Sequence, residues 1–376
     1  MSMPEVPRPS GFVRDLAPYD AVSSLSAIDD LPDGVVPLKL DWNESAIPPS
    51  PKVIESITAY LGNSHHLNWY SDLGATRLRL ALADYSGVGV DNILVTNGSD
   101  AALSLVCGSY LDPGDDVVVV WPTYGHFMVF ARARGVEPRT AAGEDLFASP
   151  TDAVIKELRP DTKMVYFASP NNPTGVVIPP EEVSRMCESH PSTLFLVDEA
   201  YYEFSGISSV GLVGQFPNLV VTRTFSKCLG IAGLRVGYLM AGDEVMENLR
   251  KLHNPKSVNS LGQIGALAAI QDREFIDSYI EEVRRAGRWL EAALGSRGAD
   301  ARITNANFIL VRVADPGLLV SALETEGVFV RDRSHMKGFA GYVRITLGTL
   351  EQMKDLIGRI DRLLEKHPAL LQPYAG

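Results

Sequence analysis

Short, mostly apolar segments, one of them with a continuous apolar run within 115–121, alternate with helical segments through the middle of the chain, and this pattern limits the possible folds more than any other feature. The apolar segments are residues 92–96, 115–121, 163–169, 193–201, 219–226 and 235–242. Helix-like segments stand between them at 99–111, 123–135 and 181–190. Continuous apolar runs indicate strands buried on both faces, and strand–helix alternation indicates a mostly parallel sheet covered by helices. The sequence therefore predicts an α/β fold.

The pattern changes near both ends of the chain. The first forty residues are rich in proline and only weakly periodic, as expected for an extended arm that needs another surface to lie on. After residue 259 we expect a long helix at 260–298, one strand or a strand pair at 302–313, and a helix at 316–328. Strands at 328–333 and 342–348 and a last helix at 350–367 complete a smaller α+β unit. A chain of 376 residues suits two or three domains. We place an arm at 1–45, a large domain at 46–258 and a small domain at 259–376.

Composition excludes several classes of protein. The net charge is −12 and basic residues form no block, which argues against a nucleic-acid partner, although a single cationic site remains possible. The cysteines Cys107, Cys187 and Cys228 form no CxxC pair, so we expect neither a disulfide nor a metal site. Nothing resembles a signal peptide or an apolar run of the ~20 residues that a membrane helix needs. We expect a cytoplasmic protein without a membrane contact.

Several catalytic signatures are missing. The chain has no Walker A loop, no G-x-G-x-x-G, no HExxH and no G-x-S-x-G. These absences argue against a kinase, a nicotinamide oxidoreductase, a zinc protease and a serine hydrolase.

Polar residues follow the predicted strands at the points where the strands end. They are Ser99 and Asp100, Thr123 and Tyr124, the segment 169–175 with Asn172, Asp198 and Tyr201, and Ser226, Lys227 and Arg235. Ligands of open parallel sheets bind outside the carboxyl ends of the strands. We therefore expect these side chains to meet in one crevice.

Part of this set is suited to a phosphate and part to an aromatic ring. Ser99 at a helix N-terminus, with Ser226 and Arg235, offers hydroxyl, N–H and guanidinium donors to a phosphate dianion. Asp198 ends an apolar strand, where an unpaired carboxylate is costly, and a pyridinium N–H is a suitable partner. Lys227 is placed to form an imine.

Two tyrosines and an asparagine complete the chemistry. Tyr124 offers a flat ring for stacking, and Tyr201 and Asn172 can share a phenolate oxygen. Taken singly, the strand-end aspartate is more often a cap, the lysine a surface residue and Asn-Pro-Thr-Gly a turn. Their joint occurrence in this order predicts pyridoxal 5′-phosphate as the cofactor.

Longer motifs resemble those of a known family. SPNNPTG, LVDEAYYEF and RTFSKCLGIAGLRVGY are similar to signatures of fold-type I pyridoxal phosphate aminotransferases of class I/II. VRDLAPY, NWYSDLGATRLRLALA, NGSDAAL, PTYGHF, SVNSLGQIGALAA and VRITLGT resemble segments of the histidinol-phosphate aminotransferase subfamily. The resemblance implies a seven-stranded, mostly parallel sheet in the large domain and an arm that packs on the small domain and on a partner subunit.

The resemblance also implies a role for each matching residue. Lys227 would form the Schiff base and move the proton, Asp198 would bind the pyridine nitrogen, and Tyr201 and Asn172 would bind the phenolic oxygen. Tyr124 would stack on the ring, and Ser99, Asp100, Ser226 and Arg235 would surround the phosphate. Tyr70 would reach the phosphate of the partner subunit, which implies a homodimer. Tyr19, Asn43, Arg331 and Arg344 would contact the substrate.

The implied reaction is the transfer of an amino group, with glutamate as the expected donor, to a keto acceptor. Imidazole-acetol phosphate, an aromatic 2-oxo acid and a ketone of a specialised pathway remain open as acceptors. A decarboxylase or cyclase on the same scaffold and a non-catalytic binding protein are the other classes. The chain departs from the subfamily at residues 41–45, at Trp69-Tyr70-Ser71 and at His126, all near the substrate side. Arg331 could alternatively form a surface ion pair with Asp332 or Asp315.

Overall fold

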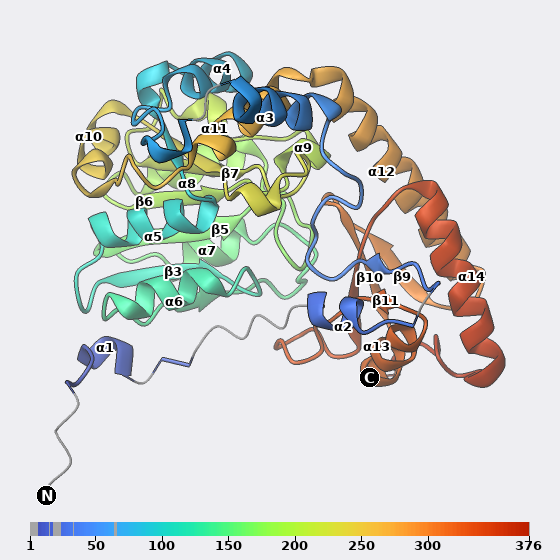
Figure 1. Cartoon of the computed structure of the whole chain (residues 1–376). Coiled ribbons are helices and arrows are strands. Elements are labelled where there is room, and N and C mark those ends of the chain that lie inside the picture. The colour runs from blue at the N-terminus through green and yellow to red at the C-terminus, as the bar shows by residue number, and fades with distance from the viewer. Residues whose placement is uncertain (1–6, 15, 18–23, 33, 64–65, 376) are drawn as a thin grey trace, which may run out of the picture.

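The computed structural model describes all residues except 1–6, 15, 18–23, 33, 64–65 and 376, and its centre is a seven-stranded sheet (Figure 1). The strands are β2 (Ile93–Thr96), β3 (Asp116–Val120), β4 (Arg139–Ala141), β5 (Thr162–Ala168), β6 (Leu194–Asp198), β7 (Leu219–Thr224) and β8 (Gly237–Ala241). Their order is β2-β8-β7-β6-β5-β3-β4. Only β8 runs against the other strands of this sheet. The predicted seven-stranded, mostly parallel sheet is confirmed.

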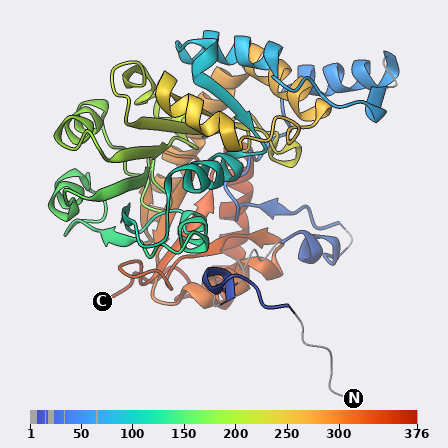
Figure 2. The same cartoon turned by 90° about the vertical axis from the view of Figure 1, so that its left-hand side faces the viewer.

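Helices cover both faces of this sheet (Figure 1 and Figure 2). They are α3 (Pro51–Asn63), α4 (Thr76–Ser86), α5 (Ser99–Tyr110), α6 (His126–Ala133), α7 (Thr151–Glu157), α8 (Pro180–Ser189), α9 (Tyr202–Ser205), α10 (Asp243–Leu252) and α11 (Ser260–Gln271). Val117 and Val119 of β3 belong to the core under α5, α6 and α10, whereas Val118 and Val120 belong to the core under α4, α7 and α8. Successive side chains of a strand point to opposite faces, so an all-apolar strand fills two cores.

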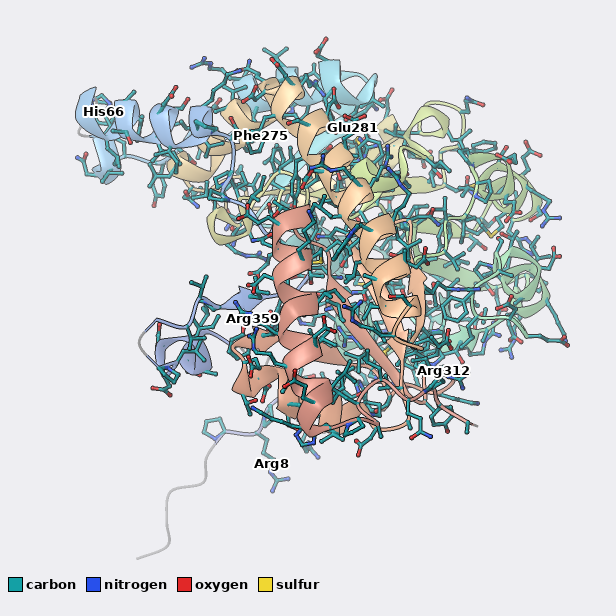
Figure 3. All side chains as sticks on the ribbon, turned by 90° about the vertical axis from the view of Figure 1, so that its right-hand side faces the viewer. Arg8, His66, Phe275, Glu281, Arg312 and Arg359 are labelled. Carbon is teal, nitrogen blue, oxygen red and sulfur yellow. The ribbon has the colours of Figure 1, made fainter. Side chains whose placement is uncertain are left out.

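The C-terminal part contains a second, antiparallel sheet. Its elements are α12 (Arg273–Gly295), β9 (Asp300–Ile303), β10 (Phe308–Arg312), α13 (Pro316–Thr325), β11 (Val328–Phe329), β12 (Arg331–Asp332), β13 (Tyr342–Thr346) and α14 (Leu350–Lys366). Four strands pair in the order β12-β13-β10-β9. The helices α12, which carries Phe275 and Glu281, and α14, which carries Arg359, lie side by side along this part (Figure 3). The segment 302–313 is thus a strand pair.

The single helix expected at 260–298 is wrong, because α11 and α12 are separate helices. Asp272 between them has φ −93° and ψ 67°, outside the helical region. Its carboxylate accepts hydrogen bonds from Ser50 Oγ and Lys52 Nζ at the start of α3. These partners lie more than 200 residues away along the chain, so local periodicity could not reveal the break.

The N-terminal arm touches both parts of the chain. Its elements are α1 (Gly11–Arg14), α2 (Leu25–Asp29) and β1 (Leu38–Lys39). The helix α1 packs on α6, whereas β1 lies against the C-terminal part. The strand β1 pairs in parallel with β11, and Leu40 N–H donates to the Phe329 carbonyl. Short 3-10 turns complete the description at η1 (His66–Asn68), η2 (Val90–Asn92), η3 (Val210–Leu212) and η4 (Ala232–Leu234).

The domain borders at 45/46 and 258/259 stay a prediction. The helix α11 packs on α3 and α4, above the large sheet, although it begins after residue 258 (Figure 1). The segment 260–271 therefore lies with the helices that cover the large sheet.

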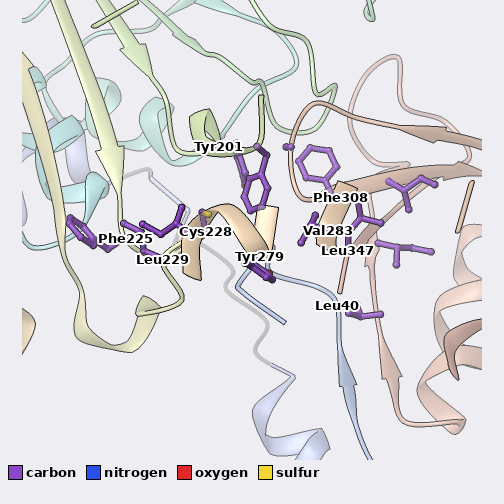
Figure 4. Close-up of a cluster of buried hydrophobic side chains, with 14 of the residues drawn as sticks. Leu40, Tyr201, Phe225, Cys228, Leu229, Tyr279, Val283, Phe308 and Leu347 are labelled. Carbon is purple, nitrogen blue, oxygen red and sulfur yellow. The ribbon is translucent and has the colours of Figure 1, made fainter. Parts of the chain in front are cut away.

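One apolar cluster joins the two sheets (Figure 4). Phe225, Cys228 and Leu229 lie at the end of β7, Tyr201 follows β6, and Tyr279 and Val283 come from α12. Phe308 of β10 packs edge-on against the Tyr201 ring, with 5.8 Å between ring centroids. The core is therefore continuous from the large sheet to the small sheet, and the candidate site lies between these sheets.

Two further features concern the described residues alone. None of their helices is both long enough and apolar enough to cross a membrane. Within the same part of the chain, no group of histidine, cysteine and acidic side chains could hold a metal ion.

Candidate active site

A cavity of about 1030 Å³ opens where the carboxyl ends of the central strands face the small sheet. Eleven of the fourteen predicted site residues line it: Ser99, Asp100, Tyr124, Asn172, Asp198, Tyr201, Ser226, Lys227, Arg235, Arg331 and Arg344. The crevice expected from the strand ends therefore exists as one cavity. The role of each residue stays a prediction.

Asp198 is a buried acid at the end of β6. Its carboxylate accepts hydrogen bonds of 3.3 Å from Tyr166 Oη and from Thr222 Oγ1. Burial, with a smaller contribution from the negative charge of Asp100, raises the pKa of Asp198 to about 6. A cationic N–H placed beside this carboxylate would relieve the cost of its burial.

Lys227 follows β7 and lines the cavity. Its Nζ donates a 2.8 Å hydrogen bond to the Trp42 carbonyl and lies 5.8 Å from the centroid of the Tyr201 ring. The amine is therefore held by the arm and by the end of β6 together. A lysine in such a place can attack a carbonyl group.

The N-terminus of α5 and the start of β8 form an anion cradle. Ser99 is the first residue of this twelve-residue helix, and Gly98 before it has φ +81°. A Cβ on Gly98 would lie 2.7 Å from Arg235 Nη2, and one on Gly237 would lie 2.5 Å from Ser99 N. At Gly237 the backbones of β8 and α5 thus approach so closely that only glycine fits, and the Ser99 N–H and the Arg235 guanidinium both lie beside Gly98.

Arg235 itself has an uncommon backbone conformation. Its φ is +54°, and Asn43, another predicted site residue, has the same φ. Non-glycine residues rarely adopt this region, and such strain is often found at functional sites. The guanidinium of Arg235 lies 3.6 Å from the Asp100 carboxylate.

Two tyrosines line the cavity, and hydrogen bonds hold both. Tyr124 Oη donates to Asp100 Oδ1 at 2.9 Å. Tyr201 Oη accepts a 3.0 Å hydrogen bond from Asn43 Nδ2. Asn43 is fully buried and also binds Thr346 of β13, so it connects the β6 end to the small sheet.

Arg344 of β13 is the most constrained cation of the site. It is only 3% exposed, and its Nη1 donates to Asn172 Oδ1 at 2.8 Å while its Nη2 donates to the Asp41 carbonyl. Its Nε has no partner, and among the described residues it has no ion pair. Burial, followed by the positive charge of Arg333, lowers its pKa well below the usual value. An anion bound here would compensate the buried charge.

Some residues at the cavity were not predicted. Trp42 provides the acceptor for Lys227, and its ring lies 5.4 Å from the Arg331 guanidinium. Thr222 stands beside Asp198 in the β6–β7 register, a neighbour that strand pairing could have indicated. The small-domain wall also includes Glu324, Arg333, His335 and Met336, which no motif singled out.

Two of the predicted residues that the structure describes, Asn43 and Tyr70, do not line the cavity. Tyr19 lies outside the described residues. Asn43 does not reach the cavity itself but donates a hydrogen bond to Tyr201, which does. Tyr70 is 77% exposed, and Lys256 Nζ lies 5.1 Å from the centroid of its ring. Its segment stands near the outer end of α3, beside His66 (Figure 3).

Together these residues fit pyridoxal phosphate. The cradle at Gly98 suits the phosphate, the buried carboxylate of Asp198 suits the ring nitrogen, and the amine of Lys227 suits the aldehyde. A fold with a parallel sheet and this site defines a pyridoxal phosphate-dependent enzyme.

Comparisons with known proteins identify the family. A family model described as aminotransferase class I and II matches residues 36–360, and the chain belongs to this family. It is 37% identical to dihydroxyacetone phosphate transaminase of Campylobacter jejuni, over 88% of this chain and 90% of the relative. It is 32% identical to histidinol-phosphate aminotransferase 2 of Methylococcus capsulatus, over 94% and 97%. The chain is thus a pyridoxal phosphate-dependent transaminase.

A solved structure matches the fold. The histidinol-phosphate aminotransferase of Sinorhizobium meliloti, in complex with pyridoxal 5′-phosphate, superposes with a TM-score of 0.85 and 22% identity. The match covers 97% of this chain and all of that one. The fold is therefore that of the fold-type I aminotransferases, as the motifs implied.

Proposed function

We propose that this transaminase moves an amino group between glutamate and a keto compound that carries a phosphate monoester. The observation that carries the proposal is the buried guanidinium of Arg344, which has no ion pair among the described residues although it faces the cavity. Arg331 lies directly opposite it on β12. A pocket with these cations suits acidic substrates of both kinds, a carboxylate and a phosphate.

The names of the relatives support an acceptor with a phosphate monoester. Two of them are named for dihydroxyacetone phosphate and for histidinol phosphate, which share a phosphate monoester and have no carboxylate. Because donor and acceptor must occupy one pocket in turn, Arg344 would bind the glutamate carboxylate and then the acceptor phosphate, to which Arg331 would add a contact.

The roles of the other residues follow from their positions. Pyridoxal phosphate, when bound, supplies an aldehyde that reacts with amines and a ring that accepts electrons. Lys227 would hold and release the proton at the substrate carbon, and Asp198 would keep the ring nitrogen protonated. Tyr124 would cover the ring, and Tyr201, oriented by Asn43, would donate to its phenolic oxygen.

A single-turnover panel tests the proposal. The holoenzyme is mixed separately with five amines. They are glutamate, histidinol phosphate, histidinol, phenylalanine, and the amine in which an amino group replaces the keto oxygen of dihydroxyacetone phosphate. We expect glutamate and at least one phosphorylated amine to convert the cofactor to its amine form, seen by absorbance. Conversion by phenylalanine but by neither phosphorylated amine would contradict the proposal that the acceptor carries a phosphate. Release of carbon dioxide without conversion would favour a decarboxylase.

We also propose a homodimer with sites at the interface. Large apolar side chains are exposed on α3, α4 and the segment between them, namely Ile54, Leu67, Trp69, Tyr70, Leu73 and Leu80. Monomeric proteins rarely expose such a group of side chains together. This surface would bury them against a second copy and bring Tyr70 to the partner's cofactor.

A further inference from the structure

Three guanidinium groups meet at the small-domain wall of the cavity. The register of the antiparallel pair places Arg331 of β12 directly opposite Arg344 of β13. Arg333 lies two residues beyond Arg331, and its N–H still donates to the Tyr342 carbonyl at 2.9 Å, so the extended pairing continues. Residues i and i+2 of an extended strand point to the same face. All three arginines line the cavity.

Like charges on one face of a sheet are unfavourable when they stand opposite each other. The effect is visible at Arg344, whose pKa is lowered by burial and then by Arg333, with a smaller effect of Arg331. Two carboxylates, Glu324 and Asp332, also line the cavity. Asp332 accepts a 2.7 Å hydrogen bond from the Ser334 N–H. Asp41 of the arm lines the cavity too, but it forms an ion pair with Lys39. The three arginines and Lys39, set against Glu324, Asp332 and Asp41, leave one net positive charge, and that surplus favours an anionic ligand at this wall.

We propose that Arg333 is a specificity-determining residue that, with Arg331, binds the phosphate monoester of the acceptor. The inference rests on the proposed function and adds a residue that no motif indicated. A carboxylate needs one guanidinium for a bidentate contact, and Arg344 is placed to provide it. A phosphate dianion has three terminal oxygens and twice the charge, so it can occupy two further guanidinium groups. Arg333 therefore distinguishes phosphorylated substrates from plain acids.

The test compares Arg333→Gln and Arg333→Lys with the wild-type holoenzyme. The matched control is Arg288→Gln, the same change at an exposed position of α12 that does not line the cavity. For the phosphorylated amine, Arg333→Gln is expected to raise KM at least tenfold with little change in kcat. For histidinol and glutamate, KM is expected to stay within about twofold. Arg333→Lys is expected to recover part of the loss, because the charge remains without the planar fork.

Equal increases of KM for glutamate and for the phosphorylated amine would show a merely structural role and overturn the inference. No change for either substrate would overturn it as well.

A second measurement separates this inference from the proposed function. Inorganic phosphate is titrated as an inhibitor of the glutamate half-reaction in the holoenzyme. We expect Arg333→Gln to weaken the inhibition at least tenfold and Arg288→Gln to leave it unchanged. If the wild type converts no phosphorylated amine, the proposed acceptor is wrong, and this inhibition alone decides on Arg333. If phosphate inhibits the wild type and Arg333→Gln equally, the inference that Arg333 binds the phosphate is overturned.

Discussion

At the scale of single residues, Asp198 has opposite effects on activity and on stability. Asp198→Asn keeps the shape and the Thr222 hydrogen bond but removes the charge that would hold the ring nitrogen protonated. We expect turnover to fall by several orders of magnitude, each tenfold step being about 1.4 kcal/mol in the barrier. Steady-state kinetics measure this fall. Activity within about tenfold of wild type would mean that another residue faces the ring nitrogen.

The same substitution is expected to stabilise the cofactor-free protein at high pH. The pKa of Asp198 is raised from 3.8 to about 6 in the folded chain. Its contribution to stability is therefore present below about pH 4 and is lost as the pH rises through 6. At pH 8, Asp198→Asn should gain about 3 kcal/mol at most, since one pKa unit equals about 1.4 kcal/mol. Urea unfolding at pH 8 and at pH 5 measures the gain, which should shrink at the lower pH.

Arg344 and Arg331 differ in the substrates they should affect. Arg344→Ala is expected to impair both half-reactions, because a charged contact in a desolvated site is worth about 2–5 kcal/mol. Arg331→Ala should impair the half-reaction of the phosphorylated substrate more than that of glutamate. Single-turnover rates with each substrate measure the two effects. Small and equal effects at both positions would refute the anion pocket.

The sequence predicts the residues of the cofactor side better than those of the substrate side. Lys227, Asp198 and Arg235 follow strand ends, and the topology of a parallel sheet brings such ends together. Trp42 lies in the arm and Arg333 beside the small sheet, and both reach the cavity only because these distant segments pack against the large sheet's strand ends. No local sequence pattern predicts that packing.

At the scale of elements, the closest backbone approach supports the anion cradle. Gly237→Ala would place a Cβ 2.5 Å from Gly98 C and Ser99 N, so β8 and α5 must move apart. We expect weaker cofactor binding and a loss of stability of about 1–3 kcal/mol. Gly233→Ala is the matched control, because a Cβ there meets nothing within 4 Å. Cofactor titration followed by absorbance, with unfolding curves, measures both effects. Equal cofactor affinity in the two variants would contradict a tight cradle.

Element boundaries follow the sequence where burial is uniform and fail where distant contacts decide. The apolar runs of β3, β5, β6 and β7 are buried along nearly their whole length. The edge strand β4, with the sequence RTA, has no apolar run and could not be found by pattern. The break at Asp272 depends on Ser50 and Lys52, which no window of sequence includes.

At the scale of the whole molecule, the site depends on two sheets that share one core. Tyr201 contacts Phe308 of the small sheet (Figure 4). Asn43 connects Tyr201 to Thr346. The cofactor side and the substrate side are thus packed against each other. A movement of one sheet against the other would change the distance between Arg344 and Lys227, the groups for the substrate anion and for the proton.

The proposed dimer predicts complementation between inactive subunits. Lys227→Ala should be inactive, and Tyr70→Ala should lose most activity because each site lacks the partner's tyrosine. In a hybrid, one site combines the intact Lys227 of one subunit with the intact Tyr70 of the other. Random exchange of equal amounts makes half of the dimers hybrids with one such site, so about a quarter of wild-type activity should return.

A matched control uses two lesions that fall in the same subunit's site. Mixing Lys227→Ala with Asp198→Asn should restore nothing, because both side chains line one cavity of a single chain. Activity is measured before and after exchange, and native mass spectrometry of tagged subunits verifies that hybrids form. Hybrids without recovered activity would place Tyr70 outside the partner's site. A fully active monomer in sedimentation would contradict the dimer itself, and the exposed side chains around Tyr70 would then need another explanation.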